Sequence, residues 1–190
     1  AGHVAYPDRA QNPMRPLLAM LEALTKKPFD AGSKEFQPSN LEVTSVESGN
    51  PVFNVIPAEA KARFNVRFND KHTIASLKKT IERRLRGAAK GARHRLEYEP
   101  PSEPYLTRRG PFVDLVTKAV AEAGGVKAAL STSGGTSDAR FIKNYCPVVD
   151  LGLVGSSMHQ IDEHVPLADL RALTLIYRRI LERYFERPPA

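Results

Sequence analysis

The stretch Ala58-Glu59-Ala60-Lys61-Ala62-Arg63-Phe64-Asn65-Val66-Arg67-Phe68 alternates apolar and polar side chains without a break. Alternation with a period of two is typical of a β-strand that buries one face and exposes the other to water. We therefore predict a strand over residues 58–68, in an antiparallel sheet that has helices packed on one face.

The segments on either side of this strand have the patterns of its neighbours. Thr73 is expected to cap a helix with apolar side chains at helical spacing, and residues 13–26 show the same spacing. Further strands are predicted over residues 41–47 and 94–99. This order of elements, helix, strand, strand, helix, strand, predicts a two-layer α+β unit.

A proline-rich segment, Pro100-Pro101-Ser102-Glu103-Pro104, is expected to be a linker at a domain boundary. Beyond it the patterns predict helices near residues 111–124, 139–144 and 167–184 and strands over residues 126–131 and 147–152. Strand, glycine loop, helix and strand form a βαβ pattern, which implies a parallel sheet. Because a parallel sheet needs more than two strands, residues 104–190 are expected to be part of a larger α/β domain.

Composition limits the class of protein. The chain has 190 residues, a net charge of +7 and one cysteine, and it begins at Ala1 without a methionine, so we expect a piece of a longer protein. The longest runs without a formal charge, 48–58 and 151–161, are much shorter than the ~18 residues of a membrane span, so we expect no such span. A lone cysteine is compatible with a reducing cytoplasm, which we predict, and with a disulfide-free periplasmic protein. The positive charge favours an anionic partner, whether nucleic acid, lipid surface or small polycarboxylate.

A glycine-rich loop is the first candidate binding site. It reads Ser133-Gly134-Gly135-Thr136-Ser137-Asp138-Ala139-Arg140 and leads into a predicted helix. Two glycines let backbone N–H groups approach an anion, the hydroxyls of Thr136 and Ser137 add donors, and Arg140 is suited to a carboxylate. A tight turn with Thr136 as a helix cap would give the same pattern.

The second candidate is the segment Met158-His159-Gln160-Ile161-Asp162-Glu163-His164, after the last predicted strand. Loops at this end of a parallel sheet gather ligands, and His159 is a candidate metal ligand or general base. A self-contained zinc site needs three or four ligands, so His159 and His164 alone do not make one. A serine hydrolase is a further alternative, although the usual Gly-x-Ser-x-Gly motif is lacking. It would combine His159 and Asp162 with Ser131, Ser133 or Ser137.

Two other places combine polar side chains. The segment Gly2-His3-Val4-Ala5-Tyr6-Pro7 contains a histidine and a tyrosine, and such a pair of donors can polarise an oxygen atom. Asn54 lies in an uncharged loop before the alternating strand, and Arg67 lies on the polar face of that strand. The most basic stretch, residues 78–90, has no interleaved aromatic side chains, so we predict no nucleic-acid binding.

Four motifs together resemble one known family. They are Gly-His-Val-Ala-Tyr-Pro at 2–7, Asn-Val-Ile-Pro-Ala-Glu with Phe-Asn-Val-Arg-Phe downstream, Ser-Gly-Gly-Thr-Ser-Asp-Ala-Arg-Phe at 133–141, and Met-His-Gln-Ile-Asp-Glu at 158–163. The chain resembles the second half of the zinc metallopeptidase family that holds acetylornithine deacetylase, carboxypeptidase G and the succinyl-diaminopimelate desuccinylases, and it is most similar to the last group. The resemblance implies that residues 1–100 are a two-layer dimerisation, or lid, domain whose first strand is missing, and that residues 104–190 are the C-terminal portion of the α/β catalytic domain.

The resemblance also implies roles for single residues. Two zinc ions activate a bridging water in this family, and His159 is expected to be a zinc ligand. His3 is expected to stabilise the oxyanion in the cleft of the partner subunit. Contacts to the substrate are expected from Tyr6, Asn54, Arg67, Gly135, Thr136 and Arg140. The family's other zinc ligands and its glutamate base have no counterpart here, so the chain alone is expected to bind no stoichiometric zinc and to be inactive.

The whole protein is therefore expected to be a cytoplasmic enzyme of lysine and cell-wall precursor biosynthesis. Its expected reaction is the zinc- or cobalt-dependent hydrolysis of N-succinyl-LL-2,6-diaminopimelate to succinate and diaminopimelate. The expected partners are this small dicarboxylate substrate and a second copy bound through the lid, with no nucleic acid and no membrane. Two alternatives are another N-acyl-amino-acid amidohydrolase of the family and a non-catalytic dimerisation or ligand-binding module.

Overall fold

A computed structural model describes residues 1–135 and 137–186 of the chain. The chain divides into two units, Ala1–Pro104 and Tyr105–Ala190, and each has its own hydrophobic core. Both helices and strands are present, so the mixed α and β fold class predicted from the sequence is confirmed. In the described part of the chain, no helix is both long enough and apolar enough to span a membrane.

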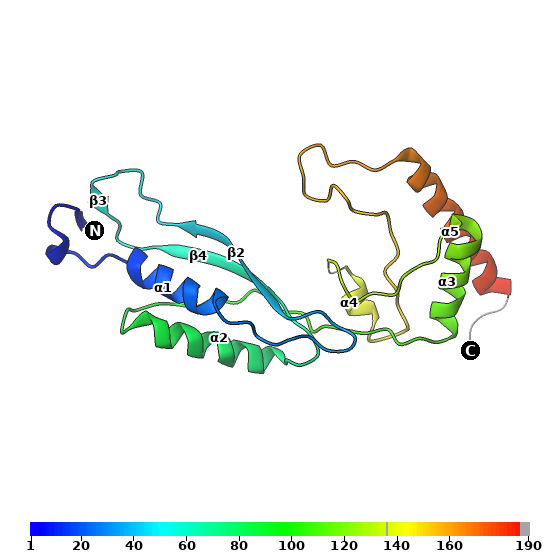
Figure 1. Ribbon diagram of the computed structural model, residues 1–190, viewed down its shortest axis with the longest axis horizontal. Coiled ribbons are helices and arrows are strands. Elements are labelled where there is room, and N and C mark those ends of the chain that lie inside the picture. Colours follow the sequence, from blue (N-terminus) through cyan, green and yellow to red (C-terminus); the bar gives the residue numbers. More distant parts are fainter. Residues whose placement is uncertain (136, 187–190) are drawn as a thin grey trace. The chain divides into compact units, whose positions relative to one another are not determined.

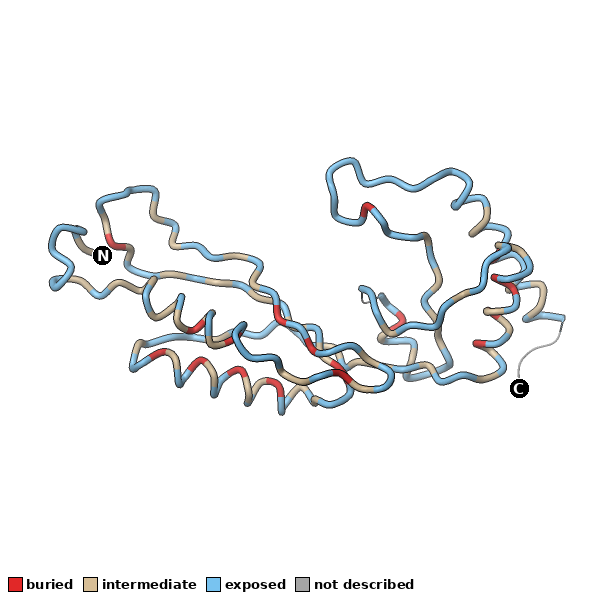
Figure 2. The backbone as a smooth tube through the Cα atoms, viewed as in Figure 1, coloured by how far each residue is buried: buried red, intermediate tan, exposed pale blue. Residues whose placement is uncertain are grey.

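The first unit consists of two layers. The strands β2 (Asn40–Glu47) and β4 (Lys61–Arg67) pair antiparallel, and the helices α1 (Met14–Thr25) and α2 (Ile74–Ala89) lie side by side along one face of the pair (Figure 1). The buried residues of α1 and α2 belong to one core cluster (Figure 2). Its buried side chains are Met20, Leu24, Leu41, Leu77, Ile81, Leu85 and Ala89. Burial of this shared apolar surface is what holds the helices to the sheet.

The sheet register keeps the apolar side chains of both strands on one face. Leu41 lies opposite Val66 and Val43 opposite Phe64, and a bulge then follows in β2 between Val43 and Ser45. A bulge adds one residue to one strand, so the pairing shifts while the inward face is preserved. The exposed face of β4 carries the polar set Lys61, Arg63, Asn65 and Arg67.

The strand predictions for this unit are only partly right. The strand predicted over 41–47 is present as β2, but the strand predicted over 58–68 is shorter, because Lys61 pairs with Glu47 and β2 ends there. The strand predicted over 94–99 is not formed, although Leu96 packs against the core. A strand forms when its backbone groups find a neighbouring strand, and the described sheet offers this segment none.

The helices α1 and α2 begin close to where they are predicted, and α2 has the predicted cap. The side chain of Asn12 accepts a hydrogen bond from the Met14 N–H at 3.0 Å, where α1 begins. Thr73 caps α2, because its hydroxyl accepts from the Ser76 N–H while the Ser76 hydroxyl accepts from the Thr73 N–H. These reciprocal bonds satisfy two donors that a helix start leaves free.

A second, smaller strand pair forms one end of the first unit. β1 (Gly2–His3) pairs antiparallel with β3 (Val55–Ile56), and the 3-10 helix η1 (Pro7–Arg9) follows β1 (Figure 1). A side chain at Gly2 would lie 2.4 Å from the Cβ of Ala10, so the close approach of these segments requires glycine. We call the residues 2–9 and 50–56 the β1–β3 tip.

In the second unit, the helices α3 (Pro111–Gly124) and α5 (Leu167–Glu186) pack together around Val116, Val120 and Ile176. The helix α4 (Ala139–Ile142) is a single turn, shorter than predicted. The strands predicted over 126–131 and 147–152 are not formed in the described residues. The second of these segments is instead attached by side chains, since the hydroxyls of Thr107 and Tyr177 donate to the carbonyl groups of Val148 and Leu151.

Candidate functional site

The β1–β3 tip brings three of the predicted site residues together, although they are about 50 positions apart in the chain. His3 lies opposite Val55, and the Val4 N–H donates to the carbonyl oxygen of Asn54 at 3.1 Å. The ring centroids of His3 and Tyr6 are 5.8 Å apart. His3, Tyr6 and Asn54 are all exposed, so their polar groups are open to a ligand.

The backbone of the tip selects one tautomer of His3. The Ala5 N–H donates to His3 Nδ1 at 3.1 Å, so Nδ1 is an acceptor and carries no proton. A neutral imidazole then carries its proton on Nε2, which becomes a hydrogen-bond donor directed away from the backbone. This arrangement suits a histidine that donates to an oxygen atom of a ligand.

Tyr6 is positioned by stacking. The Arg9 guanidinium lies 4.9 Å from the centroid of the Tyr6 ring. The His3 ring contacts the same tyrosine, with an angle of 55° between the two ring planes. Within the described residues, the Tyr6 hydroxyl has no hydrogen-bond partner. It is therefore available to a ligand oxygen.

The loop of the tip is ordered by Asn50, a residue that none of the four motifs singled out. Its side-chain amide donates to the carbonyl groups of Val52 and Val55, at 3.1 and 2.7 Å, and accepts from the Val52 N–H. These bonds fix the loop from which Asn54 projects. The Asn-Pro pair in Ser48-Gly49-Asn50-Pro51 was the available signal.

Arg67 does not belong to this group. It is the last residue of β4 and pairs with Asn40, whereas the tip lies beyond the first residue of β4, Lys61. Six residue steps along a strand correspond to about 20 Å. The structure therefore separates the first unit's predicted substrate contacts into the tip and the far end of β4.

The glycine-rich loop of the second unit has one position that requires glycine. Gly134 has φ of +116°, a conformation that other residues rarely adopt. Gly135 is exposed, and a Cβ added there would meet nothing within 4 Å, so its backbone is open to solvent. Thr136, which we predicted to bind substrate, lies outside the described residues.

Three described serines in and beside this loop use their hydroxyl groups in internal bonds. Ser131 Oγ and Ser133 Oγ are 2.6 Å apart, and the Ser137 hydroxyl donates to Asp150. Among the described residues none of these three serines is hydrogen-bonded to His159, so the arrangement offers no support for the serine hydrolase alternative.

Asp150 is the residue of this region that our sequence reasoning missed. Its two carboxylate oxygens accept hydrogen bonds from Ser137 and from the Tyr105 hydroxyl, the latter at 2.6 Å. Burial raises the pKa of Tyr105 to about 12, aided by the hydrogen bond and the charge of Asp150. Tyr105 therefore remains protonated and continues to donate.

Arg140 lies on α4, directly after the loop. Its guanidinium lies 4.6 Å from the centroid of the Phe141 ring, and its Nε atom is buried without a hydrogen-bond partner in the described part of the chain. A guanidinium is suited to bind a carboxylate through its terminal amino groups, whereas the buried Nε is closed to solvent.

His159 lies in a loop that is held by its own side chains. Buried Ser157 closes this loop, because its hydroxyl donates to the His164 carbonyl at 2.9 Å and accepts from the His164 N–H at 3.0 Å. His159 itself is exposed, with φ of +62°, and its N–H donates to Glu163 at 3.4 Å. The described residues contain no group of three or more side chains that could hold a metal ion. His159 can supply one ligand, and the described residues do not form a metal centre.

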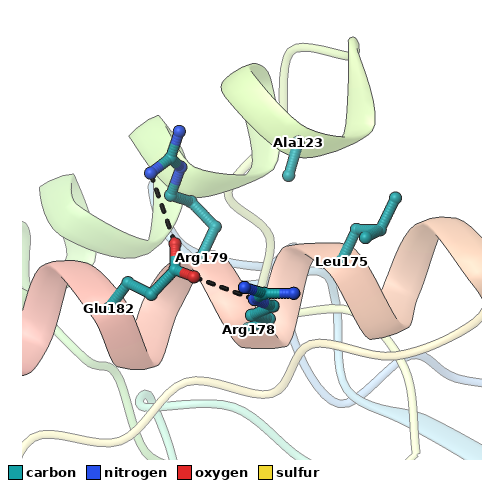
Figure 3. A pocket seen from close by; sticks show the side chains of 5 residues that line it. All are labelled: Ala123, Leu175, Arg178, Arg179 and Glu182. Carbon is teal, nitrogen blue, oxygen red and sulfur yellow. Dashed lines mark hydrogen bonds and ion pairs between the residues drawn. The ribbon is translucent and has the colours of Figure 1, made fainter.

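A surface depression between α3 and α5 lies apart from these motifs. It has about 530 Å³ of empty volume, including open solvent, and Figure 3 shows the side chains around it. Glu182 pairs there with Arg178 at 2.9 Å and with Arg179 at 3.3 Å. Its charged groups are thus paired with one another, and none of the predicted site residues lines it.

Comparison with known proteins identifies related sequences for nearly the whole chain. Residues 1–93 match the family model described as a peptidase dimerisation domain. Proteins named succinyl-diaminopimelate desuccinylase are 57% identical over 187 residues in Rhodopseudomonas palustris (strain BisB5), 57% over 185 in Xanthobacter autotrophicus (strain Py2) and 54% over 186 in Nitrobacter hamburgensis. Each match includes 97% of this chain, and the chain spans about half the length of these relatives, 48 to 49%.

Proposed function

Because residues 1–93 match the family model of a peptidase dimerisation domain, we propose that the chain is the dimerising and substrate-covering part of an amidohydrolase that releases succinate from N-succinyl-LL-2,6-diaminopimelate. The observation that supports this most is the 57% identity to proteins named succinyl-diaminopimelate desuccinylase, which extends through both units. Residues 1–100 then act as the lid and residues 104–190 as part of the catalytic domain, in a cytoplasmic enzyme of lysine and diaminopimelate biosynthesis.

The β1–β3 tip is proposed to act on the substrate of a partner subunit. His3 presents Nε2–H as a donor, which suits it to stabilise the negative oxygen that develops when an amide carbonyl is attacked. Tyr6 and Asn54 are exposed beside it and would contact the substrate. Arg67, at the far end of β4 and about 20 Å from Lys61 along the strand, would contact a different substrate molecule or a different end of it.

The second unit is proposed to bind a carboxylate of the substrate. The open backbone at Gly135 and the guanidinium of half-buried Arg140 are complementary to a carboxylate, and Thr136 is proposed to join them. His159 is proposed to be one ligand of a catalytic metal, zinc or cobalt. Because the described residues do not form a metal centre, the metal-dependent chemistry would need residues beyond them.

A chimera tests this function. This chain replaces the matching region of the Rhodopseudomonas palustris BisB5 relative, and release of diaminopimelate from N-succinyl-diaminopimelate is measured by chromatography. We expect turnover by the chimera and none by the 190-residue chain alone. A folded, dimeric chimera without turnover would favour the non-catalytic module, and a preference for another N-acyl amino acid would favour the second alternative.

Mixing two inactive variants of the chimera tests the action of His3 on the partner. A heterodimer of His3→Ala and His159→Ala subunits contains one site with both histidines only if His3 reaches across the dimer. Random pairing should then restore about a quarter of the original activity. No recovery, under conditions where subunit exchange is demonstrated, would place His3 in the site of its own subunit.

A further inference from the structure

Asp150 connects three separate segments of the second unit. Its Oδ2 accepts from the hydroxyl of Tyr105 at 2.6 Å, and its Oδ1 accepts from the hydroxyl of Ser137. Tyr105 lies directly after the proline-rich linker, and Ser137 lies in the glycine-rich loop. Both carboxylate oxygens are therefore used to fix neighbouring side chains.

The direction of these bonds determines what Ser137 can do. An ionised carboxylate only accepts hydrogen bonds, so the hydroxyl proton of Ser137 must point to Asp150. The oxygen of the same hydroxyl then accepts from the Ala139 N–H at 3.0 Å, at the start of α4. Ser137 thus has no proton left for a substrate, contrary to our expectation of a hydroxyl donor. Instead, it links Asp150 to the first residue of α4.

α4 needs such an external support. It has four residues, and a helix of one turn is not stable by itself. The Arg140 N–H donates to the Ser137 carbonyl at 3.3 Å, so the backbone of Arg140 is tied to the same residue. The opposite end of the turn is close to Tyr105 as well, since Lys143 Nζ lies 5.7 Å from the centroid of its ring.

We propose that Asp150 is a positioning residue, which acts through Ser137 and Tyr105 to hold the start of α4 and Arg140 in the arrangement that receives a carboxylate of the substrate. This inference rests on the proposed function, in which Gly135 and Arg140 contact the substrate. Asp150 itself does not contact the substrate, and its effect is on binding more than on the chemical step.

Hydrogen exchange in the 190-residue chain tests the support directly. Asp150→Asn replaces one acceptor oxygen with a donor, so we expect the amide of Ala139 to exchange about tenfold faster, while amides of α3 and α5 keep their rates. Ser137→Ala should have the same local effect, and Ser137→Thr, which keeps the hydroxyl, should restore slow exchange. An unchanged rate at Ala139 in Asp150→Asn, or equal acceleration throughout the unit, would overturn the proposal.

Kinetics of the chimera test the consequence for the substrate. We expect Asp150→Asn and Ser137→Ala to raise KM for N-succinyl-diaminopimelate about tenfold and to change kcat less than about twofold. Asp114→Asn on α3 removes the same charge from an exposed position in this unit and should leave both constants unchanged. A loss confined to kcat would overturn the proposal.

The two experiments separate this proposal from the proposed function. If the unsubstituted chimera has no turnover, the proposed function fails. The exchange rates then still decide whether Asp150 positions Ala139 and Arg140, because they require no activity.

Discussion

Arg84 shows how one side chain joins two helices of the first unit. From α2 its guanidinium donates to the carbonyl groups of Leu24, Lys27 and Pro28 at 2.9, 2.6 and 3.0 Å, in the last turn of α1 and in the segment that follows it. It also lies 4.2 Å from the centroid of the Phe29 ring. The last carbonyl groups of a helix have no partner within the helix, so a cation here satisfies them and opposes the helix dipole.

We expect Arg84→Ala to lower the free energy of unfolding by about 2 kcal/mol, because it leaves these carbonyl groups without their donor. Arg84→Lys should recover less than half of the loss, since an ammonium group cannot reproduce the planar fork. Urea denaturation followed by circular dichroism measures both. Arg83→Ala, at the exposed neighbouring position, should change stability by less than about 0.5 kcal/mol, and equal losses in the two alanine variants would contradict the assignment.

The surroundings of Asp30 predict that the stability of the first unit depends on pH. Its side chain is only 8% exposed, and burial alone would raise its pKa. Hydrogen bonds from Ser39, Asn69 and the backbone of Gly32 more than offset burial and hold the pKa well below the usual range. His72 adds a contact, with Nε2 3.2 Å from the carboxylate.

A lowered pKa in the folded state means that stability is present above the unfolded pKa of about 3.9 and is lost as the pH falls. We expect the urea midpoint of the chain to drop as the pH falls from about 5 to 3, and Asp30→Asn to reduce this slope. Asp70→Asn, at an exposed position, should keep it. If the urea midpoint falls equally with pH in the unsubstituted chain and in both variants, Asp30 is not the source of the pH dependence.

The residue-scale contacts could be predicted from sequence only where they are local. The motifs mark His3, Tyr6 and Asn54 as candidate site residues, and this stays a prediction. Their proximity depends on pairing between segments about 50 positions apart, which no local pattern specifies. Asp150 was missed for the same reason, because its partners lie 13 and 45 positions away.

At the scale of elements, the start of α2 can be tested through its cap. Thr73→Ala removes the hydroxyl that accepts from the Ser76 N–H at 3.1 Å, so the free energy of unfolding should fall by about 1 kcal/mol. Thr73→Ser keeps an acceptor in the same place and should lose much less. Chemical denaturation of the three proteins gives the comparison, and an equal loss for serine and alanine would show that the cap is not the cause.

Helices were predicted better than strands, for a physical reason. A helix pairs its backbone groups within itself, so the apolar spacing and the cap of residues 74–89 were sufficient. The segments 94–99, 126–131 and 147–152 have strand-like composition, but a strand depends on a neighbour, and the described chain gives them none. The bulge of β2 also escaped prediction, because it reflects register with β4.

At the scale of the whole molecule, the separate cores predict separate unfolding. Leu24 is 1% exposed in the core of the first unit, and Ile176 is 7% exposed in the core of the second. Truncation of a buried aliphatic side chain to alanine costs about 3 kcal/mol. We expect two calorimetric transitions, with Leu24→Ala lowering the midpoint temperature of one and Ile176→Ala that of the other. A single transition whose midpoint shifts in both variants would show that the units unfold together.

The segment between the linker and α3 has a practical consequence. Residues 105–110 form neither helix nor strand, and Arg108 and Arg109 are exposed within them, next to the boundary of the two units. Proteases prefer exposed, irregular chain, and trypsin cuts after arginine. Brief digestion should therefore separate the two cores. For expressing each unit alone, the boundary before Tyr105 is the suitable cut, because Tyr105 and Thr107 bind Asp150 and Val148 of the second unit.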